Sequence, residues 1–186
     1  MKLFDALTST KRPPKKTPVL SEAELSNRLI VINRDTAPFQ IADGSDENVH
    51  FIAEWKLRDP RWTQVFSDAG VEDTIRIYLR LVPEKHEVRA SDRRYTVSWK
   101  PSTEAKVEKE IGQDPEATVE VTLFEISHTR GQEFSLKIGG EPAYTETLES
   151  GQQRSYRFTA QELKGPIQEV VTACGWTYKG VAFGKL

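Results

Sequence analysis

Residues 75–81 read Ile-Arg-Ile-Tyr-Leu-Arg-Leu, and this stretch decides the fold. Apolar residues stand at every second position, which is typical of a β-strand with one buried face. The alternation returns in 88–90 after a turn at 83–86, and it returns again in 95–99 after Asp92. The spacing predicts three antiparallel strands in succession, each with one face in contact with water.

Other short β-rich runs lie on both sides of this central stretch. Glycine, proline and aspartate residues separate them, as turns require. The predicted strands are 39–42 and 49–57 before it, and 118–126, 133–138, 143–148 and 154–158 after it. The predicted fold class is α+β: a predominantly antiparallel curved sheet, or a partly closed β-barrel, with a packed C-terminal helix.

Two shorter helices are predicted from their N-terminal signals. Ser21 and Glu24 have the spacing of a capping box and precede an apolar face over residues 22–32. Residues 60–69 begin with a proline directly after Asp59, which suits an N-cap followed by the first helical position.

The C-terminal helix is predicted from apolar residues spaced three and four apart. Because proline in a helix interior costs about 3 kcal/mol, we expect a turn at 160–164 and a main helix that starts at Pro166. A β-bulge at Gly180 is expected in the strand that follows. The expected buried face of the helix consists of Ile167, Val170, Val171 and Cys174. The aromatic residues expected to help fill the core are Trp55, Trp62, Trp99, Trp176 and Phe183.

The composition is that of one domain with a packed core. Of the 186 residues, 37% are hydrophobic and 29% charged. We place the domain at 21–186, with a flexible basic arm at 1–20 before it and a mobile charged loop at 101–117 within it. The net charge of −2 gives no overall attraction to nucleic acid or to anionic membranes.

The expected localisation is cytoplasmic. Cys174 is the single cysteine, which excludes an internal disulfide and fits a reducing compartment. The sequence has neither a signal-peptide pattern nor an apolar run of roughly 18 residues, the length that spans a bilayer.

The C-terminal run at 175–186, Gly-Trp-Thr-Tyr-Lys-Gly-Val-Ala-Phe-Gly-Lys-Leu, is distinctive. Together with 53–56 (Ala-Glu-Trp-Lys), 59–62 (Asp-Pro-Arg-Trp) and 86–90 (His-Glu-Val-Arg-Ala), it resembles a family of small uncharacterised bacterial proteins common in actinobacteria. This resemblance implies no activity, ligand or site residue. In architecture alone, the order of elements also resembles the tubby-like and phospholipid-scramblase-like barrels, in which the C-terminal helix lies inside the barrel.

Linear signatures of catalysis and of metal binding are missing from the sequence. His50, His86 and His128 have no metal-ligand spacing, and Cys174 lies on the apolar face of a predicted helix, where a thiol is a core residue. The sequence contains no nucleophile elbow, phosphate-binding loop or dinucleotide fingerprint. No cofactor, metal or catalytic residue is therefore predicted, although a site assembled from distant strands stays open.

The water-facing side of the predicted sheet is one candidate binding surface. An aromatic ring among cations suits single-stranded nucleic acid, because phosphates meet the cations and bases stack on the ring. Acidic residues are interleaved with these cations, so cross-strand ion pairing is the interpretation that we favour over nucleic-acid binding. The residues of this predicted face are Arg76, Tyr78, Arg80 and Arg94, with Lys100 beside them.

The basic arm is the other candidate. Its apolar turn and cations would suit an anionic membrane surface, or a groove on a protein partner, and the third alternative is an ordinary solubilising tail. The candidate residues of the arm are Lys11, Arg12, Lys15 and Lys16.

These observations rank three classes of function. The first is a non-enzymatic cytosolic binding module with a protein partner. The second is a small-molecule or lipid-binding β-barrel, which predicts a cavity lined by the aromatic residues. An enzyme comes third, because no convergent polar groups are visible in the sequence. Whether the C-terminal helix fills the sheet or covers a pocket separates the first two.

Overall fold

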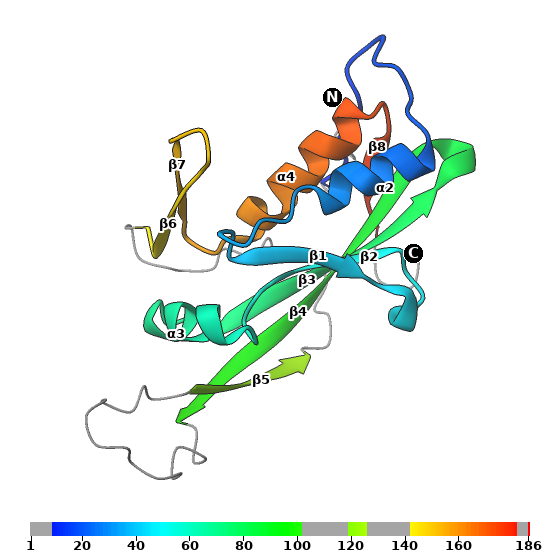
Figure 1. The fold of residues 1–186 in the computed structure, drawn as a ribbon. Helices are drawn as coiled ribbons and strands as arrows, with labels where there is room; N and C mark the ends of the chain where they lie inside the picture. The colour runs from blue at the N-terminus through cyan, green and yellow to red at the C-terminus, as the bar shows by residue number, and fades with distance from the viewer. Residues whose placement is uncertain (1–8, 102–118, 126–141, 182–185) are drawn as a thin grey trace.

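The computed structural model describes residues 9–101, 119–125, 142–181 and 186, which form an α+β fold (Figure 1). The helices are α2 (Glu22–Ile30), α3 (Pro60–Asp68) and α4 (Ala160–Ala173), with short 3-10 turns η1 (Ser45–Glu47) and η2 (Pro83–Lys85). The strands are β1 (Phe39–Asp43), β2 (Phe51–Trp55), β3 (Asp73–Val82), β4 (Glu87–Pro101), β5 (Val119–Glu125), β6 (Tyr144–Thr147), β7 (Gln153–Tyr156) and β8 (Thr177–Gly180). The predicted fold class is confirmed. Nearly all of the predicted loop at 101–117, and the predicted strand at 133–138, lie outside the described residues.

The main sheet is mixed, mostly antiparallel and open. Strands β1 to β4 neighbour one another in sequence order, each antiparallel to the next. The second edge of β4 has two partners, since β8 pairs in parallel with residues 87–90 and β5 pairs antiparallel with residues 95–101. Strands β6 and β7 form a separate hairpin. Within the described residues the sheet does not close into a barrel.

The central stretch forms two strands, so the prediction of three is wrong. The register runs without a break from Asp73 opposite Thr96 to Val82 opposite Glu87, and Asp92 lies in the middle of β4. An aspartate is tolerated there because its carboxylate forms an ion pair with Lys164 of α4. The buried residues of β4 lie on one face at 88–90 and on the other face at 95–97. The apolar alternation in the sequence therefore shifts by one residue although the strand is continuous.

Helix α4 is continuous through Pro166, so the predicted start at that proline is also wrong. The helix begins with a capping box between Thr159 and Glu162. The residue before a proline is normally kept out of the helical region by contacts of its Cβ with the proline ring. Here that residue is Gly165, which has no Cβ, so the helix passes through the Gly-Pro pair.

One face of the sheet is buried under helices. Figure 1 shows α2 and α4 side by side over the sheet, and α4 contacts β2 and β3. Edge-on contacts join Trp55 to Phe39, Phe66, Tyr156 and Phe158, and a tilted contact joins Phe66 to Phe158. Of the predicted core aromatics, Trp55, Trp62 and Trp176 are buried, Trp99 is partly buried, and Phe183 lies outside the described residues. Helix α4 therefore occupies the face that a ligand-binding barrel would leave open.

Two other helix starts confirm their predictions. Ser21 and Glu24 form the capping box of α2, with both reciprocal hydrogen bonds in place. The side chain of Asp59 accepts from the backbone N–H of Arg61 and caps α3, whose first residue is Pro60.

The described part of the basic arm, residues 9–20, is attached to the domain. The backbones of Lys11 and Tyr178 exchange hydrogen bonds of 2.8 and 2.9 Å, so the arm adds a bridge to the outer edge of β8. Leu20 donates to Cys174, and its carbonyl accepts from the indole of Trp176. The expectation of a flexible arm therefore does not apply to residues 9–20.

Candidate functional site

The face of the sheet opposite α2 and α4 is polar, and we call it the polar face. Side chains alternate between the two faces of a strand, and directly paired residues share a face. The register therefore aligns one row across β1 to β4, which contains Gln40, Glu54, Arg76 and Arg93. The polar face includes Gln40, Glu54, Arg76, Tyr78, Arg80, Glu87, Arg89, Arg93, Tyr95 and Lys179.

Two tyrosines hold the middle of the polar face together. The hydroxyls of Tyr78 and Tyr95 are 2.9 Å apart, and the guanidinium of Arg93 lies 3.9 Å from the centre of the Tyr78 ring. Tyr78 is fully buried, and this burial together with the hydrogen bond to Tyr95 raises the pKa of its phenol. Arg76 lies 5.2 Å from the Tyr95 ring centre. Tyr78 therefore lies on the predicted face of the sheet, but its side chain is buried and not exposed as expected.

The row on either side of Glu54 is paired, but with carboxylates of β2 and η1 and not with the acidic residues interleaved in β3 and β4. Arg76 Nε lies 2.6 Å from one oxygen of Glu54, and Gln40 Nε2 donates to the other oxygen at 3.0 Å. Arg93 pairs with Glu47 at 3.2 Å. The ion pairs neutralise this part of the face. The side chains of Arg76, Glu54 and Arg93 are partly buried, whereas Glu47 is exposed.

Arg94 does not belong to the polar face. It lies opposite Ile75 in the register, on the helix-covered side, and forms an ion pair with Asp73 at 3.0 Å. Lys100 has the same phase along β4 and so lies on the same side as Arg94. The sequence interpretation placed both on the wrong face because it assumed a turn at Asp92, which changes the phase of every later residue.

The end of the polar face beside β8 is rich in cations. Arg89 and Lys179 are direct partners across β4 and β8, with Glu87 as their shared carboxylate: Lys179 Nζ donates to it at 3.0 Å, and Arg89 Nε lies 3.7 Å away. The guanidinium of Arg80 donates to the backbone oxygens of Asn48 and Leu186.

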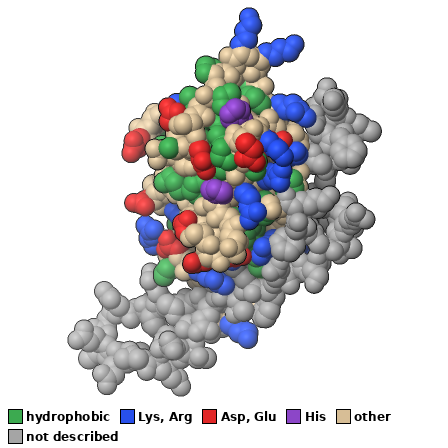
Figure 2. Space-filling view, turned by 90° about the vertical axis from the view of Figure 1, so that its right-hand side faces the viewer, with side chains coloured by type: hydrophobic (Ala, Val, Ile, Leu, Met, Phe, Trp, Pro, Cys, Tyr) green, Lys and Arg blue, Asp and Glu red, His purple; other side chains and the backbone are tan. Residues whose placement is uncertain are grey.

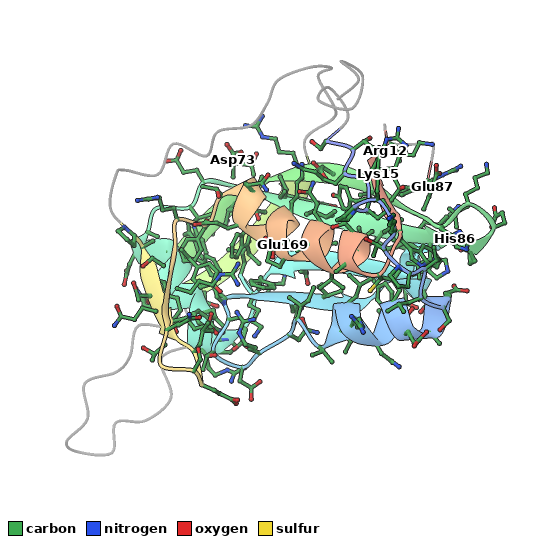
Figure 3. The ribbon with its side chains drawn as sticks, turned by 90° about the horizontal axis from the view of Figure 1, so that it is seen from above. Arg12, Lys15, Asp73, His86, Glu87 and Glu169 are labelled. Atoms are coloured by element: carbon green, nitrogen blue, oxygen red, sulfur yellow. The ribbon has the colours of Figure 1, made fainter. Side chains whose placement is uncertain are left out.

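The arm adds further cations to this end. Tyr178, the bridge partner of Lys11, is buried in the core, so strand alternation turns Arg12 towards the polar face. Seen from above in Figure 3, Arg12 and Lys15 lie on the same side of the molecule as Glu87. Lys11, Lys15 and Lys16 are exposed. We call the group Arg12, Arg80, Arg89 and Lys179 the basic end of the polar face.

The charges are unevenly spread over the side of the molecule that carries this end. In Figure 2, acidic side chains gather towards the left of the described surface, whereas cationic side chains run along its right edge and project at its top. Although the overall charge is only −2, positive and negative side chains are therefore separated locally on this surface.

Glu146 is a buried carboxylate that sequence reasoning missed. Its oxygens accept from Arg34 at 2.8 and 2.9 Å, from the hydroxyl of Thr36 at 2.7 Å and from that of Tyr156 at 2.7 Å. Burial alone would raise the pKa of Glu146, but these hydrogen bonds outweigh it and hold the pKa at about 2. The group is ionised at neutral pH and fully bonded, so it ties the β6–β7 hairpin to the chain before β1.

The remaining groups with catalytic or metal-binding chemistry do not converge. Among the described residues, no cluster of histidine, cysteine and acidic side chains has the geometry of a metal site. Burial raises the pKa of the Cys174 thiol, which lies in the core. His50 lies 3.7 Å from Glu22, His86 packs edge-on against Trp176, and His128 lies outside the described residues. No described helix has the length and apolar character required to cross a bilayer.

Comparisons with protein-family models, with curated proteins and with solved structures find no match to this chain. The resemblance to a bacterial family therefore stays a prediction, and the function is argued from the geometry alone.

Proposed function

We propose that the protein is a non-enzymatic interaction module whose basic end docks an acidic segment of a protein partner. The observation that carries the proposal is the register of β3, β4, β8 and the arm, which gathers Arg12, Arg80, Arg89 and Lys179. Within the basic end, Arg89 and Lys179 share the carboxylate of Glu87. The positive charge gathered at this end is complementary to a partner of opposite sign.

The geometry favours an acidic protein over single-stranded nucleic acid. Sequence-tolerant binding of single strands relies on bases stacked on exposed aromatic rings. The rings of Tyr78 and Tyr95 are 0% and 7% exposed, and arginines lie against them. Cations are therefore accessible at the basic end, whereas stacking platforms are covered.

Two observations favour a binding module over an enzyme or a ligand-binding barrel. Glu146 is locked in four hydrogen bonds, and Cys174 is buried with a raised thiol pKa, so neither suits acid–base or nucleophilic chemistry. The sheet is open and α4 covers one of its faces, which supports a helix that fills the sheet over a barrel with a ligand cavity.

The test is a binding titration with a labelled oligoglutamate peptide followed by fluorescence anisotropy. The double variants Arg89→Gln/Lys179→Gln and Lys15→Gln/Lys16→Gln are expected to weaken binding. The control Arg28→Gln/Arg157→Gln removes the same charge from exposed positions elsewhere and is expected to bind as the parent does. Thermal unfolding of each variant checks that the fold is retained.

The proposal fails if the control weakens binding as much as the two test variants. It fails equally if the peptide does not bind while phosphatidylserine vesicles or a labelled single-stranded oligonucleotide do. The first of these ligands would indicate membrane docking, and the second would indicate nucleic-acid binding. Binding to the peptide should weaken with salt, since the Debye length is about 8 Å at physiological ionic strength.

A further inference from the structure

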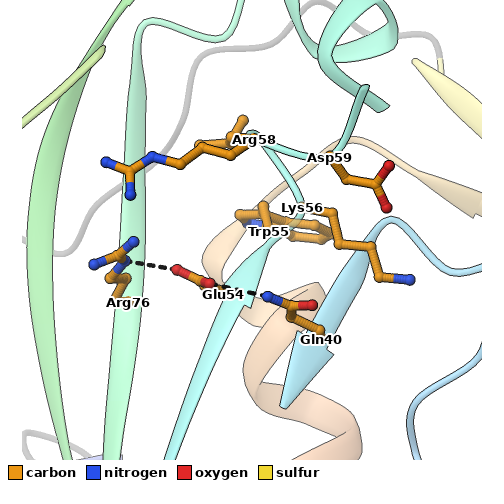
Figure 4. A pocket seen from close by; sticks show the side chains of 8 residues that line it. Gln40, Glu54, Trp55, Lys56, Arg58, Asp59 and Arg76 are labelled. Atoms are coloured by element: carbon orange, nitrogen blue, oxygen red, sulfur yellow. Dashed lines mark hydrogen bonds and ion pairs between the residues drawn. The ribbon is translucent and has the colours of Figure 1, made fainter. Parts of the chain in front are cut away.

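A small hollow lies at the other end of the polar face, where β2 leads into α3 (Figure 4). Its volume is about 90 Å3, which holds several water molecules or one compact ionic group. The polar side chains that line it are Gln40, Glu54, Lys56, Arg58, Asp59 and Arg76. They come from β1, β2, β3 and the β2–α3 connection, so segments distant in sequence build the site.

The carboxylates that line the hollow already have partners. Glu54 is bound by Arg76 at 2.6 Å and by Gln40 at 3.0 Å. Asp59 is bound by the guanidinium of Arg61 at 2.9 and 3.2 Å, and it also caps α3. Both carboxylates of the lining are therefore already paired with neighbouring side chains.

The cations of the lining are less well compensated. Arg58 forms no hydrogen bond or ion pair with any part of the chain that the structure describes, and its side chain is exposed. Lys56 donates to the carbonyl of Arg34 at 3.0 Å, which leaves its charge without a carboxylate. Burial, and after it the nearby guanidinium of Arg61, lower the pKa of Lys56, whereas the carboxylates of Asp59, Asp35 and Glu146 act in the opposite direction.

The two guanidinium groups lie on the same side of the hollow. Figure 4 shows Arg58 reaching from the β2–α3 connection towards Arg76, whose Nε lies 2.6 Å from Glu54 in an ion pair. The planar fork of an arginine matches the two oxygens of a carboxylate or a phosphate, and a guanidinium without a partner is ready to bind one.

From this geometry we infer that the hollow is a binding site for a compact oxyanion, the carboxylate or phosphate group of a small molecule. Arg58 is its main ligand, Arg76 and Lys56 supply supporting positive charge, and Gln40 offers an amide. Because the hollow admits one such group, the rest of the molecule would lie outside it, along the β2–α3 connection. This site is separate from the basic end and does not rest on the proposed docking function.

The test is a titration of the full chain with sodium phosphate and, in a second series, with sodium acetate. Sodium chloride at equal ionic strength serves as the reference, and the Nε–H signals of Arg58 and Arg76 are followed by NMR. A saturable shift beyond the chloride reference is expected for at least one of the two anions. Tighter binding of acetate would identify a carboxylate site, and tighter binding of phosphate a phosphate site.

Variants make the test specific to the hollow. Arg58→Gln is expected to weaken the apparent affinity roughly tenfold or more, because a charge-assisted hydrogen bond is lost. Arg58 is exposed, so the variant should fold as the parent does. Arg28→Gln, an exposed change on α2, is the matched control and is expected to leave the affinity unchanged.

The inference is overturned if both anions shift the signals no more than chloride does. It is also overturned if Arg28→Gln weakens binding as much as Arg58→Gln, because the effect would then reflect overall charge. The double variant Arg89→Gln/Lys179→Gln should retain anion binding here, so failure at this site is distinguishable from failure at the basic end.

Discussion

Gly175 follows the C-terminus of α4, at the point where Pro18 and Val19 of the arm pass close to the helix end. Its φ of +77° lies in the left-handed region, and an added Cβ would approach the carbonyl oxygen of Pro18 to 2.4 Å and the Cα of Val19 to 2.8 Å. Both the backbone conformation and the space therefore require glycine. The same contacts hold the described arm against the domain.

The variant Gly175→Ala should lower the free energy of unfolding by about 2 kcal/mol or more, since the clash adds to the cost of a left-handed alanine. Urea denaturation measures the change. The control is Gly151→Ala, where φ is +80° but nothing lies within 4 Å of the added Cβ. Equal losses in the two variants would show that the arm does not press on Gly175.

Glu146 is expected to be the most sensitive buried carboxylate among the described residues. Replacing it by glutamine leaves Arg34 without its counter-charge, and breaking a buried ion pair typically costs about 3–5 kcal/mol. The control is Glu149→Gln, an exposed change in the β6–β7 turn. A loss at Glu146 no larger than that at Glu149, measured by urea denaturation, would contradict a structural role for the pair.

The same carboxylate predicts an acid dependence. Its pKa is about 2 in the folded state against an ordinary value of 4.5, so ionised Glu146 stabilises the fold fully above pH 4.5. This contribution, about 3 kcal/mol, is lost as the pH falls from 4.5 towards 2. The difference in stability between the parent and Glu146→Gln should therefore shrink over that window. A difference independent of pH would contradict the lowered pKa.

Residue-scale features were predictable where their partners are close in sequence. The capping box of Ser21 and the Asp59 cap follow from spacing within one helical turn. The pair of Arg34 and Glu146 joins residues that are 112 positions apart, and neither has a local signal. Such a pair forms only because of how the β6–β7 hairpin packs, and local sequence patterns do not predict that packing.

At the scale of elements, the outer edge of β1 is protected by one side chain. The amide of Asn33 accepts from the backbone N–H of Ile41 at 2.7 Å and donates to its carbonyl at 2.8 Å. These backbone groups would otherwise be open to a strand of another molecule. The side chain therefore takes the place of a further strand at that point of the edge.

Asn33→Ala should destabilise the protein by about 1–2 kcal/mol, because two hydrogen bonds to the backbone are lost. It should also promote association through β1, which light scattering on heating would detect. The control is Asn27→Ala, an exposed change on α2. A variant that stays as monodisperse as this control would show that the edge is protected in another way.

Elements were predictable where a pattern fixes their type, and less so where packing decides between alternatives. The caps and apolar spacing located α2 and α3. At Pro166 and at Asp92 the sequence suggests a break, yet α4 and β4 continue through both. In each case the reason is specific: Gly165 removes the clash with the proline ring, and Lys164 compensates the aspartate.

At the scale of the whole molecule, the sheet separates two environments. Helices α2 and α4 bury one face, whereas the other carries paired arginines in its middle and surplus cations beside β8. The sequence predicted a basic face containing Arg76 and Arg80, but not that Arg94 lies on the other side. The face on which a residue of β4 lies depends on the register of β3 with β4. A turn wrongly assumed at Asp92 therefore assigns the residues after it to the wrong face.

The central claim is that the basic end docks an acidic protein segment, and backbone amide NMR of the full chain tests it most directly. Oligoglutamate added at low salt should cause saturable shifts at residues 10–12, 87–90 and 177–180, and little change in α2 and α3. Absence of shifts in these segments, or equal shifts throughout the helices, would contradict the claim.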